Sequence, residues 1–105
     1  MVDRPTRVLF VSGQVPAHAD GSVPPDFTEQ CRLAWANVLG VLDKAGMTRE
    51  NLVKVTTFLA DRRYREENAR VRQEMLGMHS PALTIIITGI YDEAWLLEIE
   101  AVAMA

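Results

Sequence analysis

The sequence is poor in the residues that carry metal, disulfide or nucleotide chemistry. Its one cysteine, Cys31, has no partner for an intrachain disulfide, so the disulfide framework of small secreted domains is excluded. The two histidines, His18 and His79, fall in predicted loops and have no cysteine or carboxylate pattern around them, so they predict no metal site. A glycine-rich phosphate loop is also missing. We therefore expect neither a metal nor a nucleotide cofactor.

Basic charge and long apolar runs are scarce as well. Eleven lysines and arginines stand against 14 acidic residues, which argues against a nucleic-acid partner bound through its phosphates. The nearest basic cluster, residues 62–65, is followed at once by Glu66 and Glu67, and we interpret it as a solvated helix face. No apolar run approaches the roughly 20 residues of a membrane span, and no secretory signal pattern opens the chain. We therefore expect a cytosolic protein without a membrane partner.

What remains has the composition of an ordinary globular protein. Hydrophobic residues make up 49% of the 105 positions and charged residues 24%, a balance typical of one domain with a modest core. We therefore expect a single domain over residues 1–105.

The most strongly patterned segment is a helix over residues 27–45. Its apolar residues recur every three or four positions and form one broad stripe, as in a helix with one buried face. Asp26 and Glu29 have the spacing of a capping box at its start. Gly46 stands where a left-handed residue would end it.

The other elements follow from shorter patterns. Strands are predicted at residues 8–12, 53–59, 83–88 and 95–104, the third of them apolar on both faces and therefore expected to be covered on both sides. A second helix begins after Asp61, with Tyr64, Asn68, Val71 and Met75 on its inner side. The order predicts an α+β fold, a mixed sheet with two helices on one face. Apolar residues on both faces of the last two strands then imply self-association, most simply as a symmetric homo-oligomer.

Six fragments, in order, resemble the Rid (reactive intermediate deaminase, or YjgF) family. The first, Ser12-Gly13-Gln14-Val15-Pro16, is similar to the family's "SGQxP" signature, and the match extends over most of the chain from Val8 to Val102. The others are Gln30 with Asn37-Val38, Ala45-Gly46-Met47, Val53-Lys54 with Thr56-Thr57-Phe58 and Asp61, Tyr64 with Asn68, and Pro81-Ala82 with Glu98-Ile99-Glu100-Ala101.

The resemblance implies a chorismate-mutase-like fold and a homotrimer with small-molecule clefts at its subunit interfaces. In the family's best-studied members these clefts hydrolyse enamines or imines to a 2-keto acid and ammonia. An arginine directly after the Pro-Ala pair holds the substrate carboxylate, and a glutamate of the last strand positions water. The resemblance places that glutamate at Glu98 and the polar end of the ligand at Ser12 and Gly13.

The chain departs from the family at the arginine, because Leu83 follows Pro81-Ala82. A guanidinium holds a carboxylate through two charge-assisted hydrogen bonds, and leucine holds none. The family's N-terminal cleft segment also has no counterpart before Val8. We therefore expect a substrate less anionic at this end than a 2-imino acid, in a pocket shaped by Leu83, Thr84 and Ile85.

Each candidate residue has a plain structural interpretation beside the functional one. Glu98 is either a general base or, like Glu100, a solvent-facing strand residue. Ser12 and Gly13 are expected to contact the ligand, or to make turn contacts at a strand end with the glycine at positive φ, and the two interpretations are compatible. Asn68 is best explained by a structural hydrogen bond, and Cys31 as a small core residue.

Three functions remain open at this stage. The first is a hydrolase or deaminase acting on an enamine, imine or related reactive metabolite. The second is a trimer that binds a metabolite, or regulates a partner, without chemistry, which the leucine at position 83 favours. The third, a ribonuclease or translation inhibitor, ranks last because the chain lacks a basic patch with interleaved aromatic residues.

Overall fold

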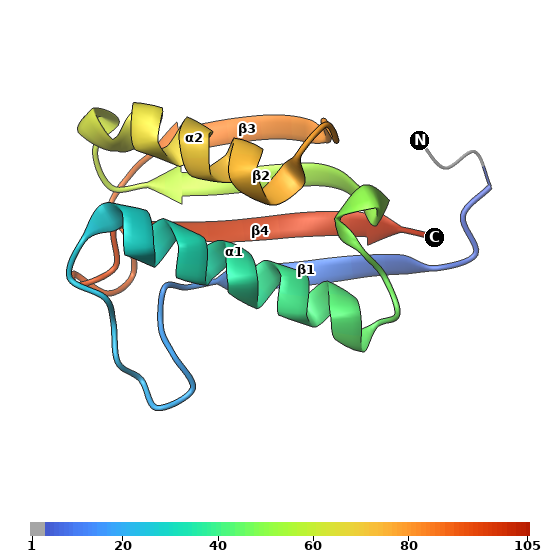
Figure 1. The fold of residues 1–105 in the computed structure, drawn as a ribbon, viewed down its shortest axis with the longest axis horizontal. Coiled ribbons are helices and arrows are strands. Elements are labelled where there is room, and N and C mark those ends of the chain that lie inside the picture. The colour runs from blue at the N-terminus through green and yellow to red at the C-terminus, as the bar shows by residue number, and fades with distance from the viewer. Residues whose placement is uncertain (1–3) are drawn as a thin grey trace.

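A computed structural model describes residues 4–105 as one four-stranded sheet with two long helices across one of its faces (Figure 1). This confirms the predicted α+β fold and the predicted order of the elements. The long elements are β1 (Val8–Gln14), α1 (Phe27–Lys44), β2 (Leu52–Leu59), α2 (Arg65–Leu76), β3 (Ala82–Ile87) and β4 (Leu97–Met104). Two short 3-10 helices, Arg49–Asn51 and Arg62–Tyr64, precede β2 and α2.

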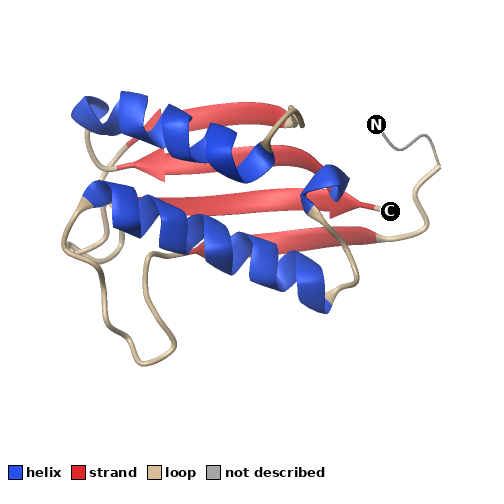
Figure 2. Ribbon diagram, in the orientation of Figure 1, coloured by secondary structure: helices blue, strands red, loops and turns tan. Residues whose placement is uncertain are grey.

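The strands lie in the order β1-β4-β2-β3. β4 pairs antiparallel with both of its neighbours, whereas β2 and β3 are parallel. A parallel pair needs a crossover connection, and α2 provides it on the same face as α1 (Figure 2). β1 and β3 are therefore the two edges of the sheet.

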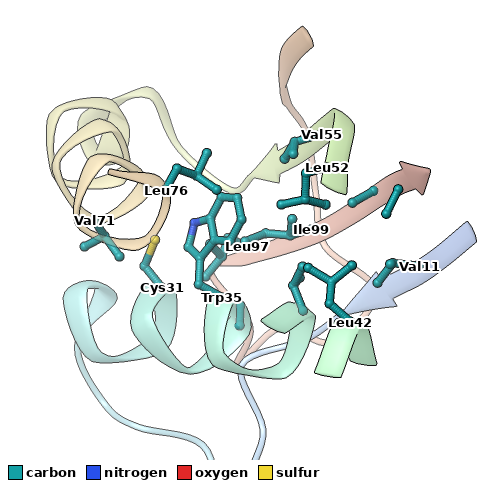
Figure 3. Packing of buried hydrophobic residues seen from close by; sticks show 14 of the residues in the cluster. Val11, Cys31, Trp35, Leu42, Leu52, Val55, Val71, Leu76, Leu97 and Ile99 are labelled. Carbon is teal, nitrogen blue, oxygen red and sulfur yellow. The ribbon is translucent and has the colours of Figure 1, made fainter. Parts of the chain in front are cut away.

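The apolar stripe of α1 lies against the sheet, as its spacing predicts. Cys31, Trp35 and Leu42 are buried, and Figure 3 shows Trp35 at the centre of the labelled core side chains. Gly46 follows the helix with φ of 72°, which confirms its predicted place at the helix end.

The predicted capping box at the start of α1 is wrong. Asp26 has the extended backbone of an N-cap, but its side chain makes no capping hydrogen bond. Glu29 is instead paired with Arg32, 3.1 Å away, so its carboxylate does not reach back to the helix start. The second predicted cap does form, since Asp61 accepts a hydrogen bond from the Arg63 amide, 2.9 Å away, and starts the 3-10 helix that leads into α2.

The core lies between the helices and one face of the sheet. Alternate residues of β4 are buried in it, and the residues between them point to the opposite face. Those buried are Leu97, Ile99, Ala101 and Ala103.

The opposite face of the sheet carries no element of the described chain, and apolar side chains lie open on it. Phe10 of β1 is 77% exposed. All six residues of β3 are exposed, on both faces of the strand: Ile86, on the open face, and Leu83, on the helix side, are each 41% exposed. The prediction that this strand is covered on both sides is therefore wrong for one chain, because β3 is an edge strand. Within residues 4–105, no helix is long and apolar enough to cross a membrane.

Candidate functional site

Glu98 lies directly over Gly13, at a bulge in β1. The pairing of β1 with β4 shifts between Val11, opposite Ala101, and Gln14, opposite Ile99, so β1 has one extra residue there. A Cβ on Gly13 would overlap the Glu98 Oε2 and lie 2.8 Å from its Cδ. Gly13 does not have positive φ, which contradicts the turn interpretation made from the sequence. The missing side chain of Gly13 is what allows the Glu98 carboxylate to lie so close to the strand.

Glu98 is half-buried and faces away from the helices. It is in register with Phe58 of β2, and both line an open hollow of about 290 Å³ together with residues 88–91, which include Ile90 and Tyr91. We call this space the Glu98 hollow. Within the described residues the carboxylate has no ion-pair partner closer than 4 Å. Glu100, two residues later on the same face, is exposed, so the two glutamates have different surroundings.

Ser12 lies on the same open face, beside the Glu98 hollow. It lines a second hollow of about 300 Å³ with Phe10, Lys54, Thr56 and Glu100. The structure thus brings Gly13 to Glu98 and places Ser12 next to them, although Ser12 lines a separate hollow.

The other predicted site residues lie elsewhere. Leu83 and Ile85 are in register with Val55 and Thr57, which are buried under the helices. Thr84 alternates with them and faces the open side. Because β2 lies between β3 and β4, Leu83 and Glu98 are two strands apart and on opposite faces. Within one chain, the predicted site residues around Glu98 and those around Leu83 therefore do not share a cleft.

A buried amide that we had noted only as part of the resemblance holds the loops around the Glu98 hollow. Gln30 of α1 is 2% exposed. Its Nε2 donates to the carbonyls of Pro24 and Ala94, at 2.9 and 3.0 Å, and its Oε1 accepts from the Leu96 amide at 2.8 Å. Gln30 thereby ties the loops before α1 and before β4 to the same helix. A glutamine inside the apolar stripe was the sequence signal for this role.

The remaining candidates are structural. The Cys31 Sγ donates to the Asn68 Oδ1 at 3.7 Å, and burial raises the pKa of the thiol to about 12. A thiol with such a pKa supplies no thiolate nucleophile near neutral pH. Among residues 4–105, no three histidine, cysteine or acidic side chains gather where a metal ion could be held.

Comparison with known proteins places the whole chain in one family. The family model described as endoribonuclease L-PSP matches residues 2–105. A RutC family protein of Haemophilus influenzae is 32% identical over 103 residues, covering 93% of this chain and 79% of that one. The RutC family protein YjgH of Escherichia coli is 46% identical over 54 residues, which span 51% of this chain and 41% of YjgH.

A solved structure agrees with the sequence matches. The crystal structure of Escherichia coli TdcF with bound serine superposes with a TM-score of 0.89, at 27% identity, over 95% of this chain and 82% of TdcF. The chain therefore belongs to the Rid/YjgF family, whose members also carry the names RutC and endoribonuclease L-PSP.

Proposed function

We propose that the chain is a hydrolase of small enamines or imines, with Glu98 as its general base. The observation that carries the proposal is the Glu98 carboxylate, laid over Gly13 and beside an open, largely apolar hollow. A carboxylate without an ion-pair partner is free to accept a proton from a water molecule. The glycine that makes room for it is otherwise unexplained, since its backbone conformation does not require glycine.

The proposed reaction adds water across a carbon–nitrogen double bond. The water oxygen bonds to the imine carbon while Glu98 takes one of the water's protons. The same carboxyl group returns that proton to the nitrogen, which gives a carbinolamine. The hydroxyl of the carbinolamine then loses its proton, which the carboxylate passes to the nitrogen, while the carbon–nitrogen bond breaks; ammonia leaves and a carbonyl product remains. No oxidant, metal or cofactor is needed for this balance.

The proposed active form is a homotrimer with its clefts between subunits. The two halves of the site, at Glu98 and at Leu83, lie on opposite faces of one chain, so a cleft that contains both requires a second copy. The open sheet face and the exposed β3 edge supply apolar surface for such contacts. The serine bound by TdcF supports a small polar metabolite as the ligand.

A binding function without chemistry is the second candidate, favoured by Leu83 at the position where the family's arginine is expected. The deciding measurement is the decay of enzymatically generated 2-iminobutyrate, trapped with semicarbazide, with and without the protein. Acceleration in proportion to protein concentration supports the hydrolase. No acceleration at high protein concentration would remove 2-imino acids from the proposal and favour binding. An RNA-cleaving function has little support, because 14 acidic residues outweigh 11 basic ones.

Replacing Gly13 by alanine tests the placement of the carboxylate. The added Cβ would occupy the position of the Glu98 Oε2, so we expect imine hydrolysis to fall at least about tenfold, in line with the cost of misplacing a catalytic group. The free energy of unfolding should change by less than about 1 kcal/mol, because the displaced group is the end of a flexible side chain. Steady-state kinetics and chemical denaturation measure the two effects.

Gly40→Ala is the matched control, because Gly40 lies on the exposed side of α1 with nothing within 4 Å of an added Cβ. It should keep full activity and raise stability by about 0.5–1 kcal/mol. Equal activity in both variants would show that the contact between Gly13 and Glu98 has no functional role.

A further inference from the structure

Leu83 opens onto a hollow that contains an arginine from a different element. The hollow has a volume of about 150 Å³ and is lined by Arg72, Leu76, His79, Ser80, Pro81 and Leu83; we call it the Arg72 hollow. A neighbouring space of about 270 Å³ shares Arg72, Leu76, His79 and Ser80 with it. Arg72 comes from α2 and lines the same hollow as Leu83, the residue that stands where the family resemblance led us to expect an arginine.

The Arg72 guanidinium lacks the partners that other arginines of the chain have. Arg32 is paired with Glu29 and Glu74, and Arg49 contacts Glu50 and the Met75 carbonyl. Within the described residues Arg72 has no ion pair, and its Nη1 is buried without a hydrogen-bond partner. An unpaired buried nitrogen of a cation is costly, and a carboxylate in the hollow would remove that cost.

Among the described residues, the lining of the Arg72 hollow includes no carboxylate. The His79 Nε2 lies 2.7 Å from the Leu52 carbonyl oxygen, to which it donates because a carbonyl only accepts, so this nitrogen is already satisfied. The Glu50 carboxylate is on the other side of the ring, 3.6 Å from Nδ1, and does not line the hollow. Ser80 adds a hydroxyl donor at the rim. Leu76, Pro81 and Leu83 give the apolar wall that a short carbon chain would contact.

We propose that the Arg72 hollow is a carboxylate-binding site, in which Arg72 of α2 supplies the cation that Leu83 does not. A volume of about 150 Å³ holds a short carboxylic acid, since a water molecule takes about 30 Å³ of the liquid. Arg72 lines the hollow, and the fork of a guanidinium can bind both oxygens of a carboxylate. The site changes our expectation of a less anionic substrate, in which Leu83 was the main argument.

The inference deepens the proposed function and rests on it only where the bound carboxylate is that of the substrate. Binding itself is testable without turnover. The probe is 2-oxobutyrate, a short 2-keto acid, and its matched control is 2-butanone, which has a carbonyl and a similar carbon chain but no carboxylate. Amide chemical shifts of the whole protein, followed by NMR during titration, locate each ligand.

We expect 2-oxobutyrate to shift the amides of His79, Ser80 and Leu83, and 2-butanone to leave them in place. Arg72→Gln should weaken the binding at least about tenfold, the effect of losing charge-assisted hydrogen bonds. Arg72→Lys, which keeps the charge, should weaken it less. Arg70→Gln removes the same charge from an exposed position of α2 and should bind as the unmodified chain does.

The outcomes separate this inference from the proposed function. Shifts of the His79 and Ser80 amides that persist in Arg72→Gln, or that 2-butanone produces equally, overturn the carboxylate site. Shifts confined to the amides around Gly13 and Glu98 also overturn it, while leaving the hydrolase proposal intact. Binding that depends on Arg72, in a protein that does not accelerate imine decay, supports the site and contradicts the hydrolase.

Discussion

Glu98→Gln is expected to reduce imine hydrolysis at least about a hundredfold, because it removes the proposed general base and changes little else. Such a base contributes about 10²–10⁴-fold to the rate. Glutamine has nearly the same size, so it fits over Gly13 where the carboxylate lies. An amide oxygen accepts a hydrogen bond but takes no proton from water. The rate of semicarbazide-trapped imine decay measures the loss.

Glu100→Gln is the matched control for this substitution. Glu100 is on the same strand and the same face, two residues from Glu98, but is exposed and in register with Thr56. Glu100→Gln removes the same charge but leaves the proposed base in place, so this variant should keep most of the activity. An equal loss in both variants would mean that the rate depends on the overall charge of the sheet face. Unchanged activity in Glu98→Gln would exclude Glu98 as the base.

Most helices and strands could be predicted from the sequence because each pattern lies within a single element. The helical stripe from Phe27 to Leu42 and the alternation within β4 each reflect one buried face. The spacing of apolar residues that marks such a face is visible along the chain. The same reasoning failed for β3. A run that is apolar on both faces predicts cover on both sides, whereas the edge position of β3 depends on the strand order.

The candidate site was predicted in part for a similar reason. Ser12, Gly13 and Glu98 followed from the resemblance, and the structure brings Gly13 and Glu98 into contact. The bulge that lets this happen comes from the pairing register of β1 with β4, which local sequence does not specify. Arg72 escaped notice because α2 carries several arginines, and only the crossover from β2 to β3 places this one near Leu83.

The segment between the Glu98 hollow and β4 is held in part by one buried side chain, besides backbone bonds such as that from the Ala60 amide to the Leu96 carbonyl. Residues 88–91 line the Glu98 hollow, and the chain enters β4 directly after Leu96, whose amide donates to Gln30. The second bond to that loop, from the Gln30 Nε2 to the Ala94 carbonyl, fixes it at another point. An amide of α1 that does not line the hollow therefore helps to fix the start of the strand that carries Glu98.

Gln30→Met is expected to lower the free energy of unfolding by about 2–4 kcal/mol. Methionine fills nearly the same volume, so the loss comes from three hydrogen bonds and not from a cavity. The Pro24 and Ala94 carbonyls and the Leu96 amide lose their partner, and each buried polar group left unpaired costs about 1–3 kcal/mol. Partial access of water to the loop carbonyls lowers the sum. Denaturant unfolding measures the change, and the melting temperature should fall by roughly 10 °C or more.

Gln73→Met separates this effect from the chemical change itself. Gln73 lies on the exposed side of α2, where the same substitution should alter stability by less than about 0.5 kcal/mol. A similar small change in Gln30→Met would show that water replaces the lost hydrogen bonds and that the glutamine does not fix the loops. If Gln30→Met instead unfolds far more easily, and also hydrolyses imines more slowly under conditions where it is still folded, then Gln30 both stabilises the fold and helps to hold Glu98 in place.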